Sequence, residues 1–286
     1  MVSTTEELLK LLDPPGSCLY HYTRLDTVVA HILPSGRINM NPLAKMRDPR
    51  ESKELNPVAR ADSPGSGTTL ERTRRFGPLH AKSRGVKEQV KVLALTRDDL
   101  SDRDPETAIF GRGFARPRLW EQYADNHRGV CLCFDCEKLV RMLRQELAPG
   151  NERIWDGPVV YRDGPIKADA YTFPDSEFDK YSDSEIIDRL ITRNKDELFF
   201  TKAKDWETEF EYRLVVPTAG MEPLPVYVRD ALRVVMLGEL VGKEYTPSIV
   251  ALLDEPGVKE LEIRILRVQW QDGAPYLRDP TAFGYS

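Results

Sequence analysis

Alternation over residues 208–216 constrains the fold more than any other feature of this sequence. One side of an extended chain would carry mostly apolar side chains: Thr208, Phe210, Tyr212, Leu214 and Val216. The opposite side would carry Glu209, Glu211 and Arg213. A period of two is typical of a β-strand, because successive side chains point to opposite faces of a sheet. We therefore predict a strand whose charged face is either exposed to water or lines a polar cleft.

The composition excludes several classes of protein. The 286 residues, 41% hydrophobic and 30% charged, suit a soluble globular protein with a sizeable core. A net charge of −5 gives no general attraction for nucleic acid or anionic membranes, so any such contact needs a local basic patch. No apolar run approaches the roughly 20 residues that span a bilayer, and the first 12 residues do not resemble a secretory signal. We expect a cytoplasmic protein with reduced thiols and no membrane contact.

Periodicity along the rest of the chain predicts strands between scattered helices. The predicted strands cover residues 18–22, 37–41, 90–96, 129–134, 154–161, 225–228, 232–237 and 261–270. The predicted helices cover residues 25–33, 137–147, 184–200 and 246–253, with a short helix opening the chain and a helical turn or two over 118–124. This arrangement favours an α+β fold over a regular βαβ alternation. We predict one domain over 1–286, with a mixed or split antiparallel sheet flanked by helices.

Residues 57–88 differ from the rest of the sequence in composition. They lack periodicity, are rich in Gly, Pro, Ser and Thr, and hold seven basic residues against three acidic ones. We predict a long mobile loop here. Six of its cations could contact nucleic acid, with binding that weakens steeply as salt is added: Arg72, Arg74, Arg75, Lys82, Arg84 and Lys87.

His21 ends a short predicted strand and is followed by Thr23 and the start of a helix. At such a position a ring nitrogen can meet a ligand hydroxyl, while Arg24 and the helix N-terminus can meet a phosphate. The alternative is a histidine satisfied by the backbone, with Thr23 capping the helix. Both interpretations stay open at this point.

Trp120 and Tyr123 lie three residues apart and share a helical face. The pair can form an aromatic wall for a flat ring, or it can belong to the core. Nearby, Cys131, Cys133 and Cys136 with His127 raise the question of zinc. The thiols of Cys131 and Cys133 alternate along one predicted strand, whereas zinc knuckles place two residues between their cysteines. We therefore predict buried thiols and no metal site.

Glu209 and Glu211 form the third candidate constellation. Two carboxylates this close repel each other, and one of them can have a raised pKa if it is desolvated. Such a pair suits chemistry that passes through a positively charged sugar, which a carboxylate stabilises. The alternative is an exposed strand face on which Arg213 pairs with its acidic neighbours. The phosphate-binding, dinucleotide-binding, nucleophile-elbow and zinc-protease motifs are absent from the sequence.

Four blocks, taken in order, resemble a bacterial family of domains of unknown function, numbered 2971. They are residues 19–23, residues 48–51, residues 119–134, and Lys202 with Trp206, Glu209, Glu211, Tyr212 and Arg213. The resemblance spans about residues 17–216. Arg47 takes the place of an Asn that the family usually has, which weakens any ligand role for that turn. The family name carries no function.

A weaker resemblance is to the ADP-ribosyltransferase fold, through the order His, aromatic, Glu along the chain. That resemblance implies NAD as a substrate, with His21 bonding a ribose hydroxyl and Tyr123 (less securely Trp120) stacking on nicotinamide. Glu211, or Glu209, would hold the other ribose and stabilise the sugar cation. The remaining dinucleotide contacts, with Arg24 at the pyrophosphate, would come from Tyr22, Thr23, Arg24 and Arg213.

Three hypotheses of different classes follow. The first is an ADP-ribosyltransferase-like enzyme that cleaves NAD and transfers ADP-ribose to an acceptor or to water. The second is a non-catalytic nucleic-acid or nucleotide-binding module of a phage-defence or mobile-element system, acting through the basic segment 57–88. The third is a catalytically silent interaction protein whose acidic strand face is only surface. We rank the enzyme first.

Overall fold

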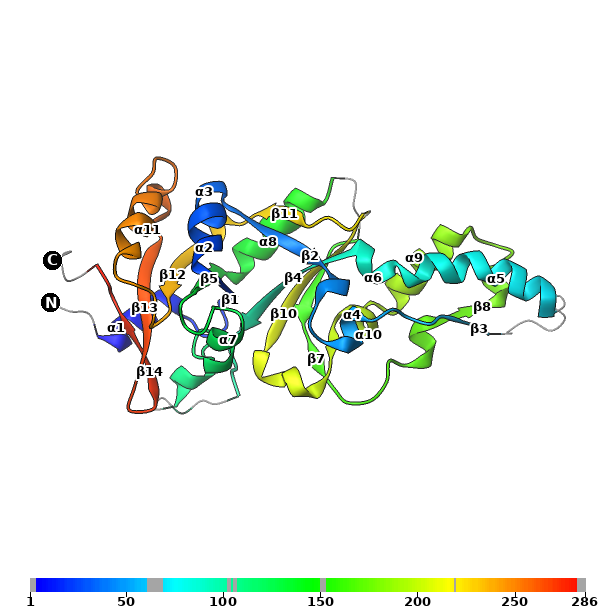
Figure 1. Cartoon of the computed structure of the whole chain (residues 1–286), viewed down its shortest axis with the longest axis horizontal. Coiled ribbons are helices and arrows are strands. Elements are labelled where there is room, and N and C mark those ends of the chain that lie inside the picture. Colours follow the sequence, from blue (N-terminus) through cyan, green and yellow to red (C-terminus); the bar gives the residue numbers. More distant parts are fainter. Residues whose placement is uncertain are drawn as a thin grey trace.

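The computed structural model describes residues 4–60, 69–101, 104, 107–149, 153–218 and 220–281, and within them confirms the α+β class. Ten strands of the described residues form one mixed, mostly antiparallel sheet (Figure 1). Eight of them follow the order β11 (Leu224–Tyr227), β2 (Arg37–Pro42), β4 (Val90–Arg97), β1 (Cys18–Thr23), β5 (Val130–Asp135), β12 (Leu232–Leu237), β13 (Arg264–Gln271) and β14 (Ala274–Arg278). In addition, β10 (Glu211–Pro217) pairs with β4 and with β6 (Trp155–Pro158). The pair β12 and β13 runs parallel.

Helices cover both faces of this sheet. One face packs against α8 (Cys136–Leu147), α11 (Tyr245–Leu253) and a helical run made of α2 (Leu25–Thr27), a π-type turn (Val28–Ile32) and α3 (Leu33–Ser35). The other face packs against α1 (Thr5–Leu9) and α7 (Pro117–Gln122). Alternation divides β1 between them, since Leu19 joins the first core cluster and Tyr20 and Tyr22 join the second. No helix in the described ranges is both long and apolar enough to cross a membrane.

The stretch 57–88, expected as a loop, is largely regular where the structure describes it. A short strand β3 (Val58–Arg60) pairs with β8 (Thr172–Pro174), and the chain then forms α5 (Thr69–Arg84) and α6 (Val86–Gln89), while 61–68 lie outside the described residues. Leu79 of α5 packs with Phe173 and Leu190 in a small separate cluster at one end of the molecule (Figure 1). Gly77 and Pro78 inside α5 hide its periodicity, so the helix depends on tertiary packing rather than on propensity.

Three predicted elements are interrupted. The strand expected over 154–161 is divided at Val159 into β6, which pairs with β10, and β7 (Val160–Tyr161), which pairs with β9 (Thr201–Lys202). The helix expected over 184–200 is divided at Asn194 into α9 (Asp183–Arg193) and α10 (Lys195–Phe199). The strand expected from Thr208 begins only at Glu211, because Lys204–Glu209 form a 3-10 helix and Phe210 adopts a left-handed conformation with φ of 47°. Glu209 therefore precedes the strand instead of sharing its face with Glu211.

The sheet is split along one edge of β4. On its other edge, β4 pairs with β10 from Thr96 back to Val90. On the split edge, β1 pairs only near the end of β4, at Thr96 and Arg97, and β2 pairs only near its start, at Lys91 and Val92. Residues 93–95 thus have no strand partner on this edge within the described ranges. A short strand β9 (Thr201–Lys202), paired with β7 (Val160–Tyr161), precedes the return of the chain to β10.

Candidate functional site

A cavity of about 440 Å³ lies along the split edge of β4. We call it the split-sheet cavity. Its volume is within the range of about 300–1,000 Å³ that is usual for small-molecule sites. Polar and charged side chains from distant parts of the sequence line it together with apolar ones, and they include His21, Asn39, Asn41, Lys45, Arg47, Tyr123, Lys202, Glu209 and Glu211.

His21 closes part of the gap between β1 and β4. Its Nδ1 is 3.3 Å from the carbonyl oxygen of Ala94, which belongs to the unpaired stretch of β4. Because a carbonyl oxygen can only accept, Nδ1 carries the proton and Nε2 of the neutral ring remains an acceptor. Burial lowers the pKa of His21 below its ordinary value of 6.5, against the opposite effect of the bond to Ala94. The ring is therefore mostly uncharged at neutral pH.

The carboxylates of Glu209 and Glu211 both contact the ammonium group of Lys202. The Nζ of Lys202 is 2.5 Å from Oε2 of Glu209 and 3.0 Å from Oε2 of Glu211. All three side chains are buried, so the interpretation of an exposed acidic face is wrong. Burial alone would raise the pKa of Glu211, but Arg213 and Lys202 outweigh it and hold that pKa below its usual value. The repulsion expected between the two carboxylates is thus offset by the shared ammonium group.

Arg213 contacts Glu211 but does not line the cavity. Its side chain is fully buried; Nε donates to Oε1 of Glu211 at 2.6 Å, and Nη1 donates to the carbonyl of Phe199 at 2.6 Å. Nη2 forms an ion pair with Glu51. Burial raises the pKa of Glu51, and Arg213 opposes that rise. The contact with dinucleotide expected for Arg213 has no support from this placement, because its donors are directed at protein groups.

A hydrogen bond connects the short helix that carries Glu51 to the segment that carries Lys202. Glu51 belongs to α4 (Pro49–Ser52), and the N-cap of this helix is Asp48. One carboxylate oxygen of Asp48 accepts from the amide of Arg50 at 2.9 Å, and the other accepts from the amide of Ala203 at 2.8 Å. Residues 48–51, one of the four blocks that resemble the family, therefore hold the Lys202 segment in place without lining the cavity. We call Lys202, Glu209, Glu211, Arg213 and Glu51 the buried ion network.

The two aromatic candidates lie in different places, one in the cavity lining and one in the core. Tyr123 lines the cavity, donates its hydroxyl to Oε1 of Glu209 at 2.9 Å, and has the Arg47 guanidinium 4.6 Å from its ring centroid. Burial, with a further contribution from Glu209, raises the pKa of Tyr123. Trp120 is completely buried and donates to the carbonyl of Phe114 at 2.8 Å. Of the two aromatic candidates, Tyr123 therefore lines the cavity and Trp120 is core.

The residues around His21 contribute less than the resemblance implied. Tyr22 is in the cavity lining, yet its hydroxyl donates to the carbonyl of Gly113 at 2.7 Å and its ring packs edge-on against Trp120. Thr23 lies outside the lining. Arg24 also lies outside it, exposed and paired with Asp26 at 2.9 Å. The expectation that Arg24 binds a pyrophosphate is not supported, because its guanidinium is engaged on the surface.

Lys45 and Arg47 are the exposed cations of the cavity lining. From the sequence alone, Lys45 was overlooked, a ligand role for the turn at Arg47 was discounted, and Lys202 and Glu51 were assigned no role. Asp48 before Pro49 is a recognisable helix start, since Asp is a favoured N-cap and Pro a favoured first helical residue. That signal could have located α4, but nothing in the sequence indicates which distant cation Glu51 meets.

None of the four cysteines lines this cavity. Cys131 and Cys133 are buried in β5, where burial raises the pKa of both thiols. In the part of the chain that the structure describes, no group of His, Cys, Asp and Glu side chains is arranged to hold a metal ion.

Several cations of the basic segment are bound within the protein. Lys82 pairs with Asp183 at 2.9 Å, and Arg84 pairs with Glu54. Lys87 is buried and donates to the carbonyls of Arg50 and Lys53 at 2.6 and 2.8 Å. Arg74 is exposed, whereas the side chains of Arg72 and Arg75 lie outside the described set.

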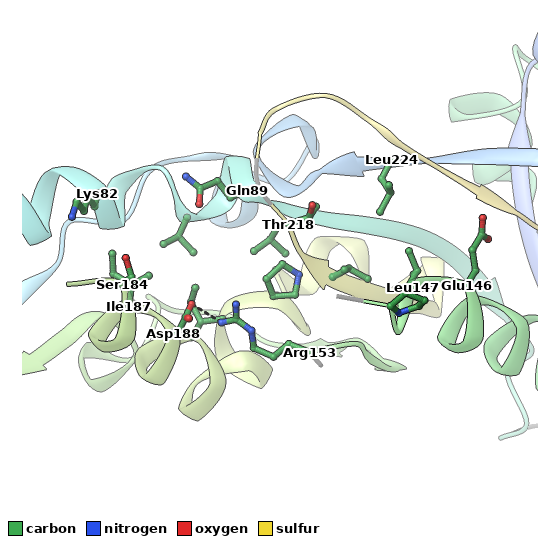
Figure 2. Close-up of a pocket in the computed structure, with 16 residues that line it drawn as sticks. Lys82, Gln89, Glu146, Leu147, Arg153, Ser184, Ile187, Asp188, Thr218 and Leu224 are labelled. Atoms are coloured by element: carbon green, nitrogen blue, oxygen red, sulfur yellow. Dashed lines mark hydrogen bonds and ion pairs between the residues drawn. The ribbon is translucent and has the colours of Figure 1, made fainter. Parts of the chain in front are cut away.

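A second cavity, of about 670 Å³, lies between α9, the end of α8 and the end of β10 (Figure 2). We call it the helix-side cavity. Its walls include the apolar side chains of Val86, Val90, Leu147, Ile187, Ile191, Val216 and Leu224. Arg153 and Asp188 form an ion pair at 2.5 Å across part of its rim, with 34% and 52% of their side-chain surfaces exposed. This cavity has no counterpart of the buried ion network among its described lining residues.

Comparison with known proteins supports one part of the expected resemblance. A family model described as "Protein of unknown function (DUF2971)" matches residues 119–214, about a third of the chain. This range contains Tyr123, Lys202, Glu209, Glu211 and Arg213, whereas the blocks 19–23 and 48–51 lie outside it. No curated protein and no solved structure matches the chain. The resemblance to ADP-ribosyltransferases gains no support from these comparisons.

Proposed function

We propose that this chain is an ADP-ribosyltransferase-like enzyme that cleaves NAD at the bond between nicotinamide and ribose. The ADP-ribose passes to an acceptor or to water. One observation carries the proposal: His21, Tyr123, Glu209 and Glu211 come from distant parts of the sequence and line one cavity. They follow the chain order His, aromatic, Glu by which the sequence resembles these enzymes.

The charge balance of the buried ion network suits a cationic reacting centre. The network holds the carboxylates of Glu51, Glu209 and Glu211 against the cations of Lys202 and Arg213. With all five groups ionised, three carboxylates against two cations give the network a net charge of −1, although each carboxylate contacts a cation. Fixed charges in a site of low dielectric stabilise the opposite charge that develops during a reaction. The oxidised nicotinamide ring is a cation, and so is the sugar carbon as that ring departs.

Each lining residue then has a role that fits its contacts. Nε2 of His21, the free acceptor, takes a hydrogen bond from a ribose hydroxyl. The ring of Tyr123 packs against nicotinamide, and Arg47, an exposed side chain now lying over that ring, moves aside to the pyrophosphate together with Lys45. Glu211 faces the sugar carbon, and its lowered pKa keeps it ionised there.

The bond between the nicotinamide nitrogen and the ribose carbon breaks, and its electron pair leaves with nicotinamide, which becomes neutral. The ribose carbon carries positive charge next to the Glu211 carboxylate. An oxygen or nitrogen of the acceptor, or a water oxygen, forms the new bond to that carbon and releases one proton.

The test measures release of free nicotinamide from NAD by chromatography, with water and with mixtures of protein, nucleic-acid and small-molecule acceptors. Glu211→Gln should lower the rate by at least about 100-fold, as expected when a group aimed at developing charge is removed. Tyr123→Ala, which does not disturb the contacts of Arg213, should weaken NAD binding. Asp188→Asn in the helix-side cavity is the matched control and should react like wild type. Absence of both nicotinamide release and calorimetric NAD binding in the folded wild type would contradict the proposal.

The alternative of a non-catalytic nucleic-acid-binding module has less support. Lys82, Arg84 and Lys87 all have partners within the protein, which leaves fewer cations of the basic segment for phosphates. If this alternative holds, mixed DNA or RNA should bind with an affinity that falls steeply as salt is added.

A further inference from the structure

We infer that Lys202 and Glu51 are positioning residues of the split-sheet cavity. Lys202 holds the carboxylates of Glu209 and Glu211 together, and Glu51 holds Glu211 in place through Arg213. The catalytic consequence of this inference rests on the proposed function, but the arrangement can be tested without any substrate.

The contacts of Lys202 leave its ammonium group little freedom. The Nζ is within hydrogen-bond distance of one oxygen of Glu209 and one oxygen of Glu211, at 2.5 and 3.0 Å. The ring centroid of Trp206 is 4.6 Å from the same nitrogen, which is a cation–π distance. Lys202 is 5% exposed, so solvent competes little for its protons. It therefore fixes the spacing of the two acidic side chains.

Glu51 acts from the other side of the network. It forms an ion pair with Nη2 of Arg213, while Nε and Nη2 of Arg213 donate to the two oxygens of Glu211 at 2.6 and 3.0 Å. Both contacts on Glu211 come from one planar guanidinium, so they set the rotation of the carboxylate as well as its position. Glu51 and Arg213 lie outside the cavity lining, which leaves Glu211 as the group that can face a ligand.

Removal of Lys202 should change the protonation of Glu211. Two carboxylates close together without a cation between them cannot both remain ionised easily, so one takes up a proton at a higher pH. The titratable or charged groups around the pair are Glu51, Tyr123, Tyr161, Lys202 and Arg213, together with His21, Lys45 and Arg47 of the cavity lining. Burial raises the pKa of both Tyr123 and Tyr161, so these phenols remain neutral near pH 7. Lys202 is thus the cation shared by both carboxylates.

The substrate-free test titrates Glu211 by NMR of side-chain carboxylate carbons in protein labelled with carbon-13 glutamate. In wild type the midpoint should lie below that of an ordinary glutamate. In Lys202→Met it should rise by about one pH unit or more, the size expected when an adjacent opposite charge is lost. Lys202→Arg keeps the charge and should stay near wild type. Lys195→Met, which removes a lysine paired with Asp196 on the surface, should leave the Glu211 midpoint unchanged.

An unchanged Glu211 midpoint in folded Lys202→Met would overturn the inference. If that variant does not fold, the double variant Lys202→Met with Glu209→Gln removes one charge of each sign, and the midpoint of Glu211 is compared there with that of Glu209→Gln alone. The inference predicts a higher midpoint in the double variant, and equal midpoints would overturn it.

The catalytic consequence is tested separately on the wild-type reaction. Lys202→Met should lower kcat more than it raises KM, and the acid limb of the rate profile should move to higher pH together with the NMR midpoint. Glu51→Gln should also lower kcat more than it raises KM. If wild type cleaves NAD and both variants keep its kcat and pH profile, the positioning role is refuted while the proposed function stands. If the NMR midpoint shifts but wild type does not cleave NAD, the proposed function fails and only the substrate-free arrangement stands.

Discussion

The split-sheet cavity and the helix-side cavity differ more in their charges than in their size. The helix-side cavity is larger, about 670 Å³ against 440 Å³, but its Arg153–Asp188 pair is substantially exposed (Figure 2). The split-sheet cavity is built on five buried charged side chains. Burial of a charge destabilises a protein unless the charge is paired and hydrogen-bonded. A network of this kind therefore points to function in a way that an open volume does not.

Arg213→Met should produce the largest difference between the two regions. It leaves Glu51 and Glu211 buried without their shared cation, which should lower the free energy of unfolding by about 3–5 kcal/mol. Arg153→Met removes an exposed partner and should change it by only about 0–1 kcal/mol. Urea denaturation of both variants measures these changes in the free energy of unfolding. Equal losses in the two variants would remove the distinction between the cavities.

Tyr123→Phe should have a smaller effect on stability. The change removes the hydroxyl that donates to Glu209, and hydrogen bonds to charged groups contribute about 1.5–3 kcal/mol. The ring remains, so NAD affinity should change far less than in Tyr123→Ala. Urea denaturation and calorimetric titration with NAD test the two parts. If both variants lose affinity equally, the hydroxyl rather than the ring recognises the ligand.

The free energy of unfolding should depend on pH through the protonation of His21. Because its pKa is lowered in the folded protein, the unfolded chain binds more protons between that lowered value and about 6.5. Stability therefore rises with pH in this window and is lost as the pH falls below about 6.5. His21→Asn should lose less stability than wild type between pH 7.5 and 5.5, as measured by urea unfolding at each pH. Identical losses would show that the imidazole is not desolvated.

Asp188→Asn should have the smallest effect of all. Its carboxylate is half exposed, so loss of the pair with Arg153 should change the free energy of unfolding by about 0–1 kcal/mol. Nicotinamide release should be unaffected. A marked loss of turnover, measured by chromatography alongside the wild type, would indicate that the reaction depends on the helix-side cavity.

Local patterns in the sequence predict much of this fold. Alternation locates β10 from Glu211 onward, and the strand carrying His21 is β1 as expected. The left-handed conformation of Phe210 was not predictable, because that backbone geometry usually requires Gly or Asn. It leaves Glu209 at the end of the 3-10 helix, where it still contacts the Lys202 that Glu211 also contacts.

Contacts between distant segments mark the limit of sequence reasoning about the site. The sequence indicates that His21, Tyr123 and Glu211 are candidates, but the partner of Arg24 on the surface and the partner of Glu51 in the interior depend on tertiary packing. Likewise, Trp120 and Tyr123 share a helical spacing, and only the elements packed against α7 decide that one is core and the other lines the cavity.

Equilibrium binding of NAD, measured by calorimetry, tests most directly whether the split-sheet cavity is the site. Wild type, Glu211→Gln and Asp188→Asn should bind with similar affinity, since Glu211 acts mainly on the sugar cation, whereas Tyr123→Ala should bind at least tenfold more weakly, roughly 1.4 kcal/mol. Failure of wild type to bind NAD, or loss of binding in Asp188→Asn with binding retained in Tyr123→Ala, would contradict this assignment.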